Sequence, residues 1–248
     1  MLVIGFLLGG KVFASIEKKR AEEKIQEVTA QIKEEENERV EEIQGKLNEA
    51  LKEEEERNIP WNLTLVNYNH PLDEDYKIAE FTELEPGYSV DARIGDAAKQ
   101  MLADAKSEGL KIIICSAYRS VEKQERLFNE TVQTWLDAGM TYWEAFDETR
   151  LSVAEPGTSE HAMGLALDLI SNQYIELDEK QEETKEAKWL AQNCHKYGFI
   201  LRYPPEKTDI TGIIYEPWHY RYVGVEDATK IMQLGITLEE YLAEYYEI

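Results

Sequence analysis

Hydrophobic and polar residues follow two different patterns along this chain, and the change falls near Pro60. In residues 16–58, apolar side chains recur at three- and four-residue spacings among charged ones, as at Val40, Ile43 and Leu47. This period predicts a helix with one apolar stripe. Pro60 ends the helix, because proline cannot continue the backbone hydrogen-bond ladder.

The apolar stripe of residues 16–58 is interrupted. One set of apolar positions is Ile25, Val28 and Ile32, and a second set, offset by one residue, is Val40, Ile43, Leu47 and Ala50. The offset breaks the heptad phase and weakens any long coiled coil. We therefore expect a charged helical stalk that self-associates weakly at most. A helix that docks into a partner's groove is the alternative.

From residue 59 onward, short apolar runs separated by turn residues predict a globular domain over 59–248. Strands are expected at 63–66, 111–115, 165–170 and within 213–222, and helices at 96–108, 121–137, 141–150 and 182–197. These elements show no regular βαβ rhythm. The order favours an α+β domain, with an antiparallel sheet and flanking helices, preceded by the helical stalk.

Residues 1–15 form an apolar run around Gly5, Gly9 and Gly10. The run is shorter than the roughly 20 residues that cross a membrane, and it lacks the basic leader of a secretory signal. We expect an export signal or a membrane anchor, incomplete at its start. A buried N-terminal segment is the alternative.

Composition narrows the functional classes. The 43% of hydrophobic residues can build a substantial core, while the formal net charge of -23 excludes a nucleic-acid partner, because a surface that follows phosphates needs clustered Lys and Arg. Cys115 and Cys194 are too few for a disulfide framework. Two separate buried thiols are expected instead.

Two of the four histidines lie in two short segments, 159–168 and 216–219. His161, Asp168 and His219 together offer two imidazoles and one carboxylate. Such a set leaves a fourth position open on a divalent ion, which is typical of catalytic rather than structural zinc. The remaining carboxylate, Glu216, can accept a proton from a water molecule at that position.

The local pattern around the first histidine suits such a site. Gly164 permits a tight turn or a close backbone approach. On the strand that follows, Leu165 and Leu167 face one way, whereas Ala166 and Asp168 face the other. The small Ala166 leaves room for an ion beside Asp168.

In the second segment, 216–219, both polar side chains can reach one site only if the backbone is irregular. On a regular strand Glu216 and His219 would point to opposite faces, but Pro217 indicates a bulge or an edge that could turn both toward one site. The other two histidines, His70 and His195, are expected to be surface or helix-end residues and not ligands.

Together these segments resemble the zinc D-alanyl-D-alanine carboxypeptidases of the VanY type, part of a wider group that includes lysostaphin-type peptidases and the hedgehog signalling domain. The similar motifs are Ser159-x-His161-x-x-Gly164-x-Ala166-x-Asp168 and Glu216-x-x-His219. Residues 116–120 (Ser-Ala-Tyr-Arg-Ser) with Gln124, and blocks 197–204 and 216–223, agree with that family. The resemblance covers residue 61 to the end, in the order that the family has.

The resemblance implies a role for each matched residue. It implies that zinc is bound by His161, Asp168 and His219, that Glu216 is the general base and later the proton donor, that Arg119 stabilises the oxyanion, and that Gln124 and Ser159 help to hold the terminal residue. It also implies a hedgehog/D,D-peptidase-like fold and an extracytoplasmic location, either membrane-anchored or secreted to the cell wall.

The expected activity is removal of the C-terminal D-Ala from peptidoglycan stem peptides. The enzymatic alternatives are an L,D-carboxypeptidase acting on tetrapeptide stems and a dipeptidase of the same group. The alternatives of another class are a non-catalytic zinc-containing module that binds the cell wall and a stalk-based scaffold carrying an inactive domain. Glu216 and Arg119 argue against both, because a binding module needs neither a base nor an oxyanion clamp.

Overall fold

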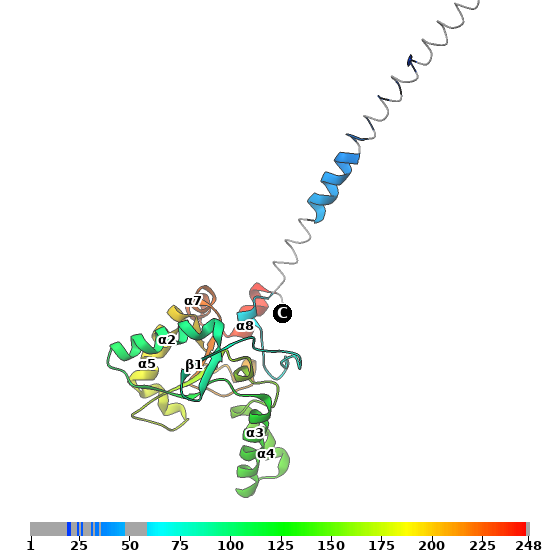
Figure 1. Cartoon of the computed structure of the whole chain (residues 1–248). Coiled ribbons are helices and arrows are strands. Elements are labelled where there is room, and N and C mark those ends of the chain that lie inside the picture. Colours follow the sequence, from blue (N-terminus) through cyan, green and yellow to red (C-terminus); the bar gives the residue numbers. More distant parts are fainter. Residues whose placement is uncertain are drawn as a thin grey trace, which may run out of the picture. The chain divides into compact units, whose positions relative to one another are not determined.

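The structure is a computed structural model of the 248-residue chain (Figure 1). It describes residues 59–246 continuously and, before them, residues 36–47 and a few single positions between 19 and 34. The chain divides into two compact units, Met1–Asn58 and Ile59–Ile248. Each unit is described by itself.

In the first unit, residues 36–47 are helical, in agreement with the predicted stalk helix. The apolar side chains of Val40, Ile43 and Leu47 are exposed, and Lys46 pairs with Glu42 at 2.7 Å. The predicted export signal or anchor at 1–15 and the first apolar set of the stripe lie outside the described residues. Within the described part of the chain, none of the helices combines the length and the apolar character needed to cross a membrane.

The second unit combines helices with two antiparallel sheets. Its strands are β1 (Phe81–Glu85), β2 (Tyr88–Asp91), β3 (Ile112–Ser116), β4 (Ala166–Ser171), β5 (Phe199–Leu201) and β6 (His219–Tyr222). Its α-helices are α2 (Ala92–Ser107), α3 (Val121–Asp137), α4 (Tyr142–Ser152), α5 (Lys185–Asn193), α6 (Thr208–Thr211), α7 (Val225–Leu234) and α8 (Leu238–Tyr245). Short 3-10 turns are η1 (Trp61–Leu63), η2 (Glu160–Met163), η3 (Glu179–Glu183) and η4 (Cys194–Tyr197). The expected α+β class with an antiparallel sheet is confirmed.

The larger sheet has the strand order β3-β4-β6-β5, and all its neighbours are antiparallel. Its register puts Asp168 of β4 opposite both Ser116 of β3 and His219 of β6. The β3–β4 pairing shifts between Ile114 and Ser116, so the ladder is irregular there. Three polar side chains therefore lie in one row across three strands.

The two faces of this sheet have different chemistry. Leu167 and Tyr220 are paired across β4 and β6 and belong to the main buried cluster. Their neighbours Asp168 and His219 point to the other face, because side chains alternate along a strand. The face expected for Asp168 is therefore the one observed, and one side of the sheet is left free for polar chemistry.

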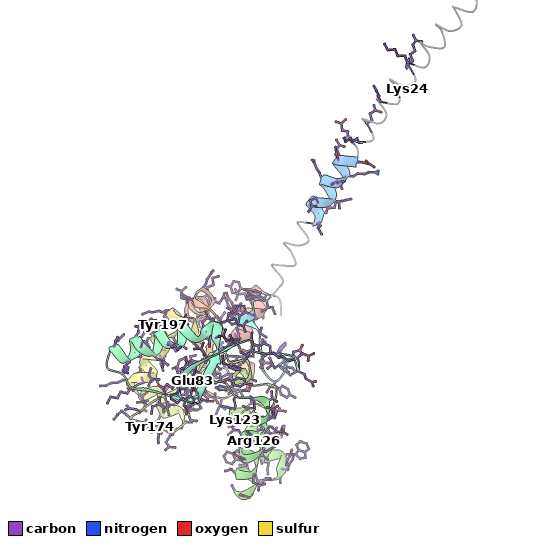
Figure 2. The ribbon with its side chains drawn as sticks, in the orientation of Figure 1. Lys24, Glu83, Lys123, Arg126, Tyr174 and Tyr197 are labelled. Carbon is purple, nitrogen blue, oxygen red and sulfur yellow. The ribbon has the colours of Figure 1, made fainter. Side chains whose placement is uncertain are left out.

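Helices α2 and α5 cover the apolar face. Ile94 and Met101 of α2 and Leu190 of α5 share the main cluster with the sheet. The turn η4 is fastened to α2, because the hydroxyl of Tyr197 donates to Asp104 at 2.7 Å (Figure 2). A dry layer of this kind holds the strands, and hence the polar row on the opposite face, in a fixed register.

Two further clusters complete the unit. Helices α7 and α8 pack with β5 and η1 around Leu63, Ile200 and Tyr241. Helices α3 and α4 form a pair that packs through Phe128 and Ala145 (Figure 1). The start of α3 is capped by the Ser120 hydroxyl, which accepts from the backbone of Lys123.

Several predicted elements need correction. The segment 63–66 is not a strand: it begins at the last residue of η1, and the carbonyl oxygen of Thr64 accepts a hydrogen bond from Arg221 instead of joining a ladder. The predicted helix 182–197 is divided. Thr184 caps α5, which begins at Lys185, by accepting a hydrogen bond from the backbone of Ala187, and the chain tightens into η4 after Asn193.

Helix α2 begins four residues before the predicted start at 96. Asp91 caps it by accepting from the backbone of Arg93 at 2.9 Å. A glycine such as Gly95, in the first turn, normally disfavours a helix. Here it is needed for close packing, because a Cβ at this position would lie 2.7 Å from the side chain of Thr82. The β1–β2 hairpin, β5, and helices α7 and α8 were not predicted.

Both cysteines are free thiols, as expected. Cys194 is buried in the main cluster, and burial raises its pKa to about 12. Cys115 is only half-buried, unlike the expectation, because it lies at the irregular position of β3.

Candidate active site

A cavity of about 270 Å³ opens on the polar face of the larger sheet. All seven residues singled out from the sequence line it: Arg119, Gln124, Ser159, His161, Asp168, Glu216 and His219. These residues come from four separate parts of the chain. The fold therefore brings the predicted site residues to one place.

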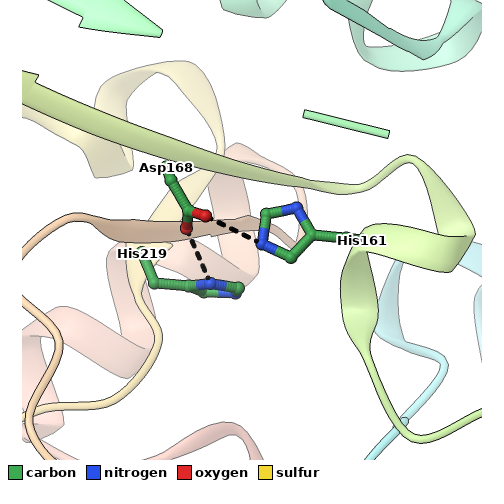
Figure 3. A group of neighbouring side chains, drawn as sticks. All are labelled: His161, Asp168 and His219. Atoms are coloured by element: carbon green, nitrogen blue, oxygen red, sulfur yellow. Dashed lines mark ion pairs between the residues drawn. The ribbon is translucent and has the colours of Figure 1, made fainter. Parts of the chain in front are cut away.

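Three of these side chains form a compact donor set (Figure 3). His161 Nε2 lies 3.2 Å from Asp168 Oδ2, and His219 Nδ1 lies 3.1 Å from Asp168 Oδ1. One ligand atom of each residue lies within 4.8 Å of those of the other two. Two imidazole nitrogens and one carboxylate oxygen at this spacing match the donors that zinc prefers.

The outer nitrogen of each imidazole has its own partner. His161 Nδ1 lies 2.7 Å from the carbonyl oxygen of Ala117, and His219 Nε2 lies 3.3 Å from Glu160 Oε2. Because each partner is an acceptor, each outer nitrogen carries a hydrogen. The inner nitrogens are then free to bind a cation, the arrangement that metal-ligating histidines usually have.

The carboxylate of Asp168 supports the same conclusion. Its Oδ1 is buried and has no well-formed hydrogen bond, although His219 Nδ1 is close. A buried carboxylate oxygen without a donor is costly. A divalent cation between these residues would satisfy it, so the donor set fits a metal ion.

The loop geometry that carries His161 is specific. His161 lies in η2, which ends at Gly164 with φ of 67°. A Cβ at Gly164 would come within 2.8 Å of the backbone nitrogen of Asp91. The close approach expected at this glycine is thus present, and no other residue would fit without displacing β2.

A buried ionic network lies behind His219. Glu160 Oε1 accepts hydrogen bonds from Arg202 and from Arg221, each at 2.7 Å. Arg202 also pairs with Glu239 at 2.6 Å. Burial opposes ionisation of Glu160, but the two guanidinium groups hold its pKa well below the usual range. The partner of His219 is therefore a carboxylate anion.

The carboxylates also set the charge of the two imidazoles. Burial lowers the pKa of His219, but Asp168 and Glu160 outweigh this effect and raise it to about 9. Burial lowers the pKa of His161 below its ordinary value, against the opposing effect of Asp168. Of the two imidazoles, His219 is therefore the one that carries an extra proton when no cation is bound.

Glu216 enters the cavity from a turn that precedes β6. Residues 217–218 form the turn, and the backbone nitrogen of His219 donates to the Glu216 carbonyl at 3.2 Å. This turn, and not the expected bulge or strand edge, brings Glu216 Oε2 to 3.8 Å from His219 Nδ1. Burial raises the pKa of Glu216 to about 8. A nearby cation would lower it again, which suits a group that exchanges protons near neutral pH.

Arg119 is held in a fixed direction by its neighbours. Its guanidinium donates to Gln124 Oε1 at 2.8 Å and to Ser116 Oγ at 2.7 Å, and it lies 3.5 Å from Asp168. Gln124 in turn donates to the carbonyl oxygen of Ala154 at 2.6 Å. A planar cation that is positioned in advance can recognise an oxyanion or a carboxylate.

The sequence did not point to the outer residues of the site. The sequence predicts no role for Glu160, Arg202 or Arg221, which form the network behind His219. Tyr203 and Trp218, which line the cavity, are not predicted either. The available signal was a charged residue within an apolar run, as at Arg202 between Leu201 and Tyr203. The other two histidines are elsewhere: His70 contacts Asn67 and His195 lies in η4.

Comparisons with known proteins agree with this site. Residues 87–225 match the family described as VanY, D-alanyl-D-alanine carboxypeptidase. A D-alanyl-D-alanine carboxypeptidase of Enterococcus faecalis is 43% identical over 183 residues, which cover 73% of this chain and 66% of that protein. The chain thus spans about two thirds of the length of this relative.

Solved structures show the same fold. A VanY D,D-pentapeptidase variant in complex with Zn(II) is 40% identical, with a TM-score of 0.67 over 74% of this chain and 99% of that one. VanYB in complex with D-alanine-D-alanine is 41% identical, with a TM-score of 0.67 over 74% and 98%. The L,D-carboxypeptidase LdcB is 36% identical, with a TM-score of 0.63 over 73% and 85%. The family match covers more than half of the chain, and with these identities it shows that the chain belongs to the VanY family of D-alanyl-D-alanine carboxypeptidases.

Proposed function

We infer that this chain is a zinc-dependent D,D-carboxypeptidase that removes the C-terminal D-Ala from peptidoglycan stem peptides. The observation that carries this inference is the convergence of His161, Asp168 and His219 in a cavity that also holds Glu216 and Arg119. Relatives of the same family have been solved with Zn(II) and with D-alanine-D-alanine. The required cofactor is therefore Zn²⁺.

His161 Nε2, one oxygen of Asp168 and His219 Nδ1 would hold the metal. When bound, zinc supplies Lewis-acid polarisation of the scissile carbonyl and lowers the pKa of water from 15.7 to about 7. The protein keeps these ligands in place through Ala117 and Glu160, which fix the two rings. Three protein ligands leave a position open for the substrate.

Glu216 is proposed as the general base. Its buried carboxylate is close enough to the donor set to take a proton from the attacking water and to pass it to the leaving amine of D-Ala. A pKa near neutrality favours both transfers.

Arg119, Gln124 and Ser159 are proposed to bind the substrate. The Arg119 guanidinium would stabilise the oxygen that becomes negative in the transition state, because it is already oriented by Gln124 and Ser116. Gln124 and the buried Ser159 would hold the terminal residue. This assignment predicts that a free terminal carboxylate is required.

One enzymatic alternative has specific support. LdcB, an L,D-carboxypeptidase, shares the fold at 36% identity. The two activities differ in the stereochemistry of the residue before the scissile bond, and that residue would lie against the wall of the same cavity. We favour D,D activity because the Enterococcus faecalis relative, at 43% identity, is named a D-alanyl-D-alanine carboxypeptidase.

Enzymes that act on peptidoglycan work outside the cytoplasm, and this chain is assigned the same location.

We propose further that residues 1–15 serve as an export signal or membrane anchor and residues 16–58 as a stalk. The exposed stripe of Val40, Ile43 and Leu47 supports weak self-association of the stalk. Sedimentation of a peptide covering residues 16–58 tests this: a monomer at all concentrations would exclude the association.

Zinc-dependent release of D-Ala from a synthetic pentapeptide ending in D-Ala-D-Ala tests the activity. The purified chain should release one D-Ala per peptide, a chelator should stop the release, and added zinc should restore it. A zinc-loaded, folded protein that binds the peptide without cleaving it would instead indicate a non-catalytic binding module.

A further inference from the structure

A second cavity, of about 360 Å³, lies beside the active-site cavity. Arg119, Leu127, Asp168 and Leu177 line both cavities. The two spaces therefore share a wall, and a peptide bound at the zinc ligands could continue from one into the other. None of the roles assigned above uses this second space.

The second cavity contains two cations from α3. Lys123 and Arg126, both labelled in Figure 2, line it. They lie three positions apart on α3 and are therefore neighbours on the surface of that helix. Both side chains are exposed. Neither side chain makes a hydrogen bond or an ion pair with any residue in the described part of the chain. Their positive charge is therefore available to a ligand.

The acidic residues nearby leave this charge available. Glu130 also lines the cavity but pairs with neither cation among the described residues. Glu122, on the same helix, is fully exposed, and its pKa is lowered mainly by the Ser120 hydroxyl, with Arg126 as a minor cause. Exposed partners of this kind compete weakly with a bound anion.

This arrangement contrasts with the rest of the protein. The chain has a formal net charge of -23, and other basic groups near the site already have partners, as Arg119 has Gln124 and Arg202 has Glu160. Two unpaired cations beside the active site of such an acidic protein would attract an anionic group of the substrate and orient it.

We propose that Lys123 and Arg126 bind a second carboxylate of the substrate, carried by a residue that precedes the two terminal residues of the peptide. This inference rests on the proposed function, because the terminal carboxylate is there assigned to Gln124 and Ser159. An extended peptide advances about 3.3–3.6 Å per residue, so a residue upstream of the scissile bond would pass the shared wall and enter the second cavity, which Lys123 and Arg126 line.

Two matched pairs of pentapeptides test this inference and identify the source of the carboxylate. The first pair is acetyl-L-Ala-γ-D-Glu-L-Lys-D-Ala-D-Ala and its counterpart with D-isoglutamine in second place. The second pair carries meso-diaminopimelate, free or amidated, in third place on the D-isoglutamine background. All four keep the same terminal carboxylate. The measured quantity is the ratio of kcat/KM for the acid to kcat/KM for the amide.

For one of the pairs, the wild-type ratio should be about threefold to tenfold, as expected for one or two partly exposed charge pairs. In the variant Lys123→Gln/Arg126→Gln the ratio should fall close to one. Lys99→Gln is the matched control, because Lys99 is an exposed cation on α2 that lines neither cavity, and it should leave the ratio unchanged. The peptide pair whose ratio exceeds one identifies the residue that carries the carboxylate.

Two results would overturn the inference while leaving the proposed function intact. One is a ratio of one for both pairs in a wild-type enzyme that cleaves all four peptides. The other is a ratio above one that survives in the double variant. A zinc-loaded wild-type protein that cleaves none of the four peptides would overturn the proposed function and this inference with it.

Discussion

Glu160 is the hydrogen-bond partner of His219, with Oε2 of the carboxylate 3.3 Å from Nε2 of the ring. Its other oxygen is held by Arg202 and Arg221, so the carboxylate cannot rotate away. The buried network therefore fixes the ring of His219 with Nδ1 directed into the cavity. A carboxylate behind a ligating histidine also makes the ring a stronger donor.

Glu160→Gln should weaken zinc binding by about 10- to 100-fold, the usual cost of losing such a partner. It should also lower the free energy of unfolding by about 3–5 kcal/mol, because the buried guanidinium of Arg221 loses the carboxylate that it pairs with and Arg202 keeps only Glu239. Competition with a chelator measures the first effect, and urea unfolding measures the second.

Glu239→Gln is the matched control. Glu239 pairs with the same Arg202 but does not contact His219. Its loss should reduce stability and leave zinc affinity nearly unchanged. If both variants weaken zinc equally, Glu160 acts through stability alone and the orienting role is wrong.

His161→Ala should abolish stoichiometric zinc binding, because it removes one of three protein ligands. His195→Ala changes the same residue type in η4, outside the cavity, and should keep one zinc per chain. Elemental analysis of the two purified proteins distinguishes them. Full zinc occupancy in the His161 variant would remove it from the ligand set.

Zinc binding should release at least one proton at pH 7, because His219 must bind in its deprotonated form and a cation also favours loss of the proton from Glu216. The pKa of His219 in the zinc-free site is raised to about 9, so its ring carries the extra proton below that pH and loses it above. Zinc affinity should therefore increase with pH up to about 9 and level off beyond it. Calorimetry in buffers of different ionisation enthalpy gives the proton count, and a count of zero at pH 7 would contradict the charge assigned to His219.

Glu216→Gln should retain zinc and lose about 10²- to 10⁴-fold in kcat, the usual contribution of a general acid-base group. The amide fills the same space but cannot accept the proton of the attacking water. Peptide hydrolysis and zinc content, measured on the same preparation, check both statements. Wild-type turnover in this variant would mean that another residue is the base.

The polar residues of the site were accessible from the sequence because their types are rare and their spacing is short. His161 and Asp168 lie on either side of Gly164, and the alternation of β4 gives the face of Asp168. The outer network was not accessible, because Arg202 and Glu160 are 42 positions apart and meet only in the folded sheet.

Predictions from local sequence patterns were wrong where tertiary contacts decide the structure. The apolar run 63–66 favours a strand, but Arg221 binds the carbonyl oxygens of Asn62 and Thr64 and holds the segment outside the sheet. The sequence did not predict the β1–β2 hairpin, because β1 alternates between exposed and half-buried residues and contains no fully buried position. Helix α2 starts before Gly95 because Asp91 caps it, although a glycine at this point favours a later start when only the sequence is considered.

The most direct test of the proposed activity is mass spectrometry of defined stem peptides after incubation with the zinc-loaded protein. The substrates are a pentapeptide ending in D-Ala-D-Ala, the tetrapeptide that lacks the last residue, and the pentapeptide with an amidated C-terminus. We predict release of a single D-Ala from the pentapeptide, little further trimming of the tetrapeptide, and little cleavage of the amide. An amidated end would leave the polar groups of Gln124 and Ser159 without their proposed carboxylate partner, which costs on the order of 1–3 kcal/mol or more. Faster cleavage of the tetrapeptide than of the pentapeptide would contradict the D,D assignment.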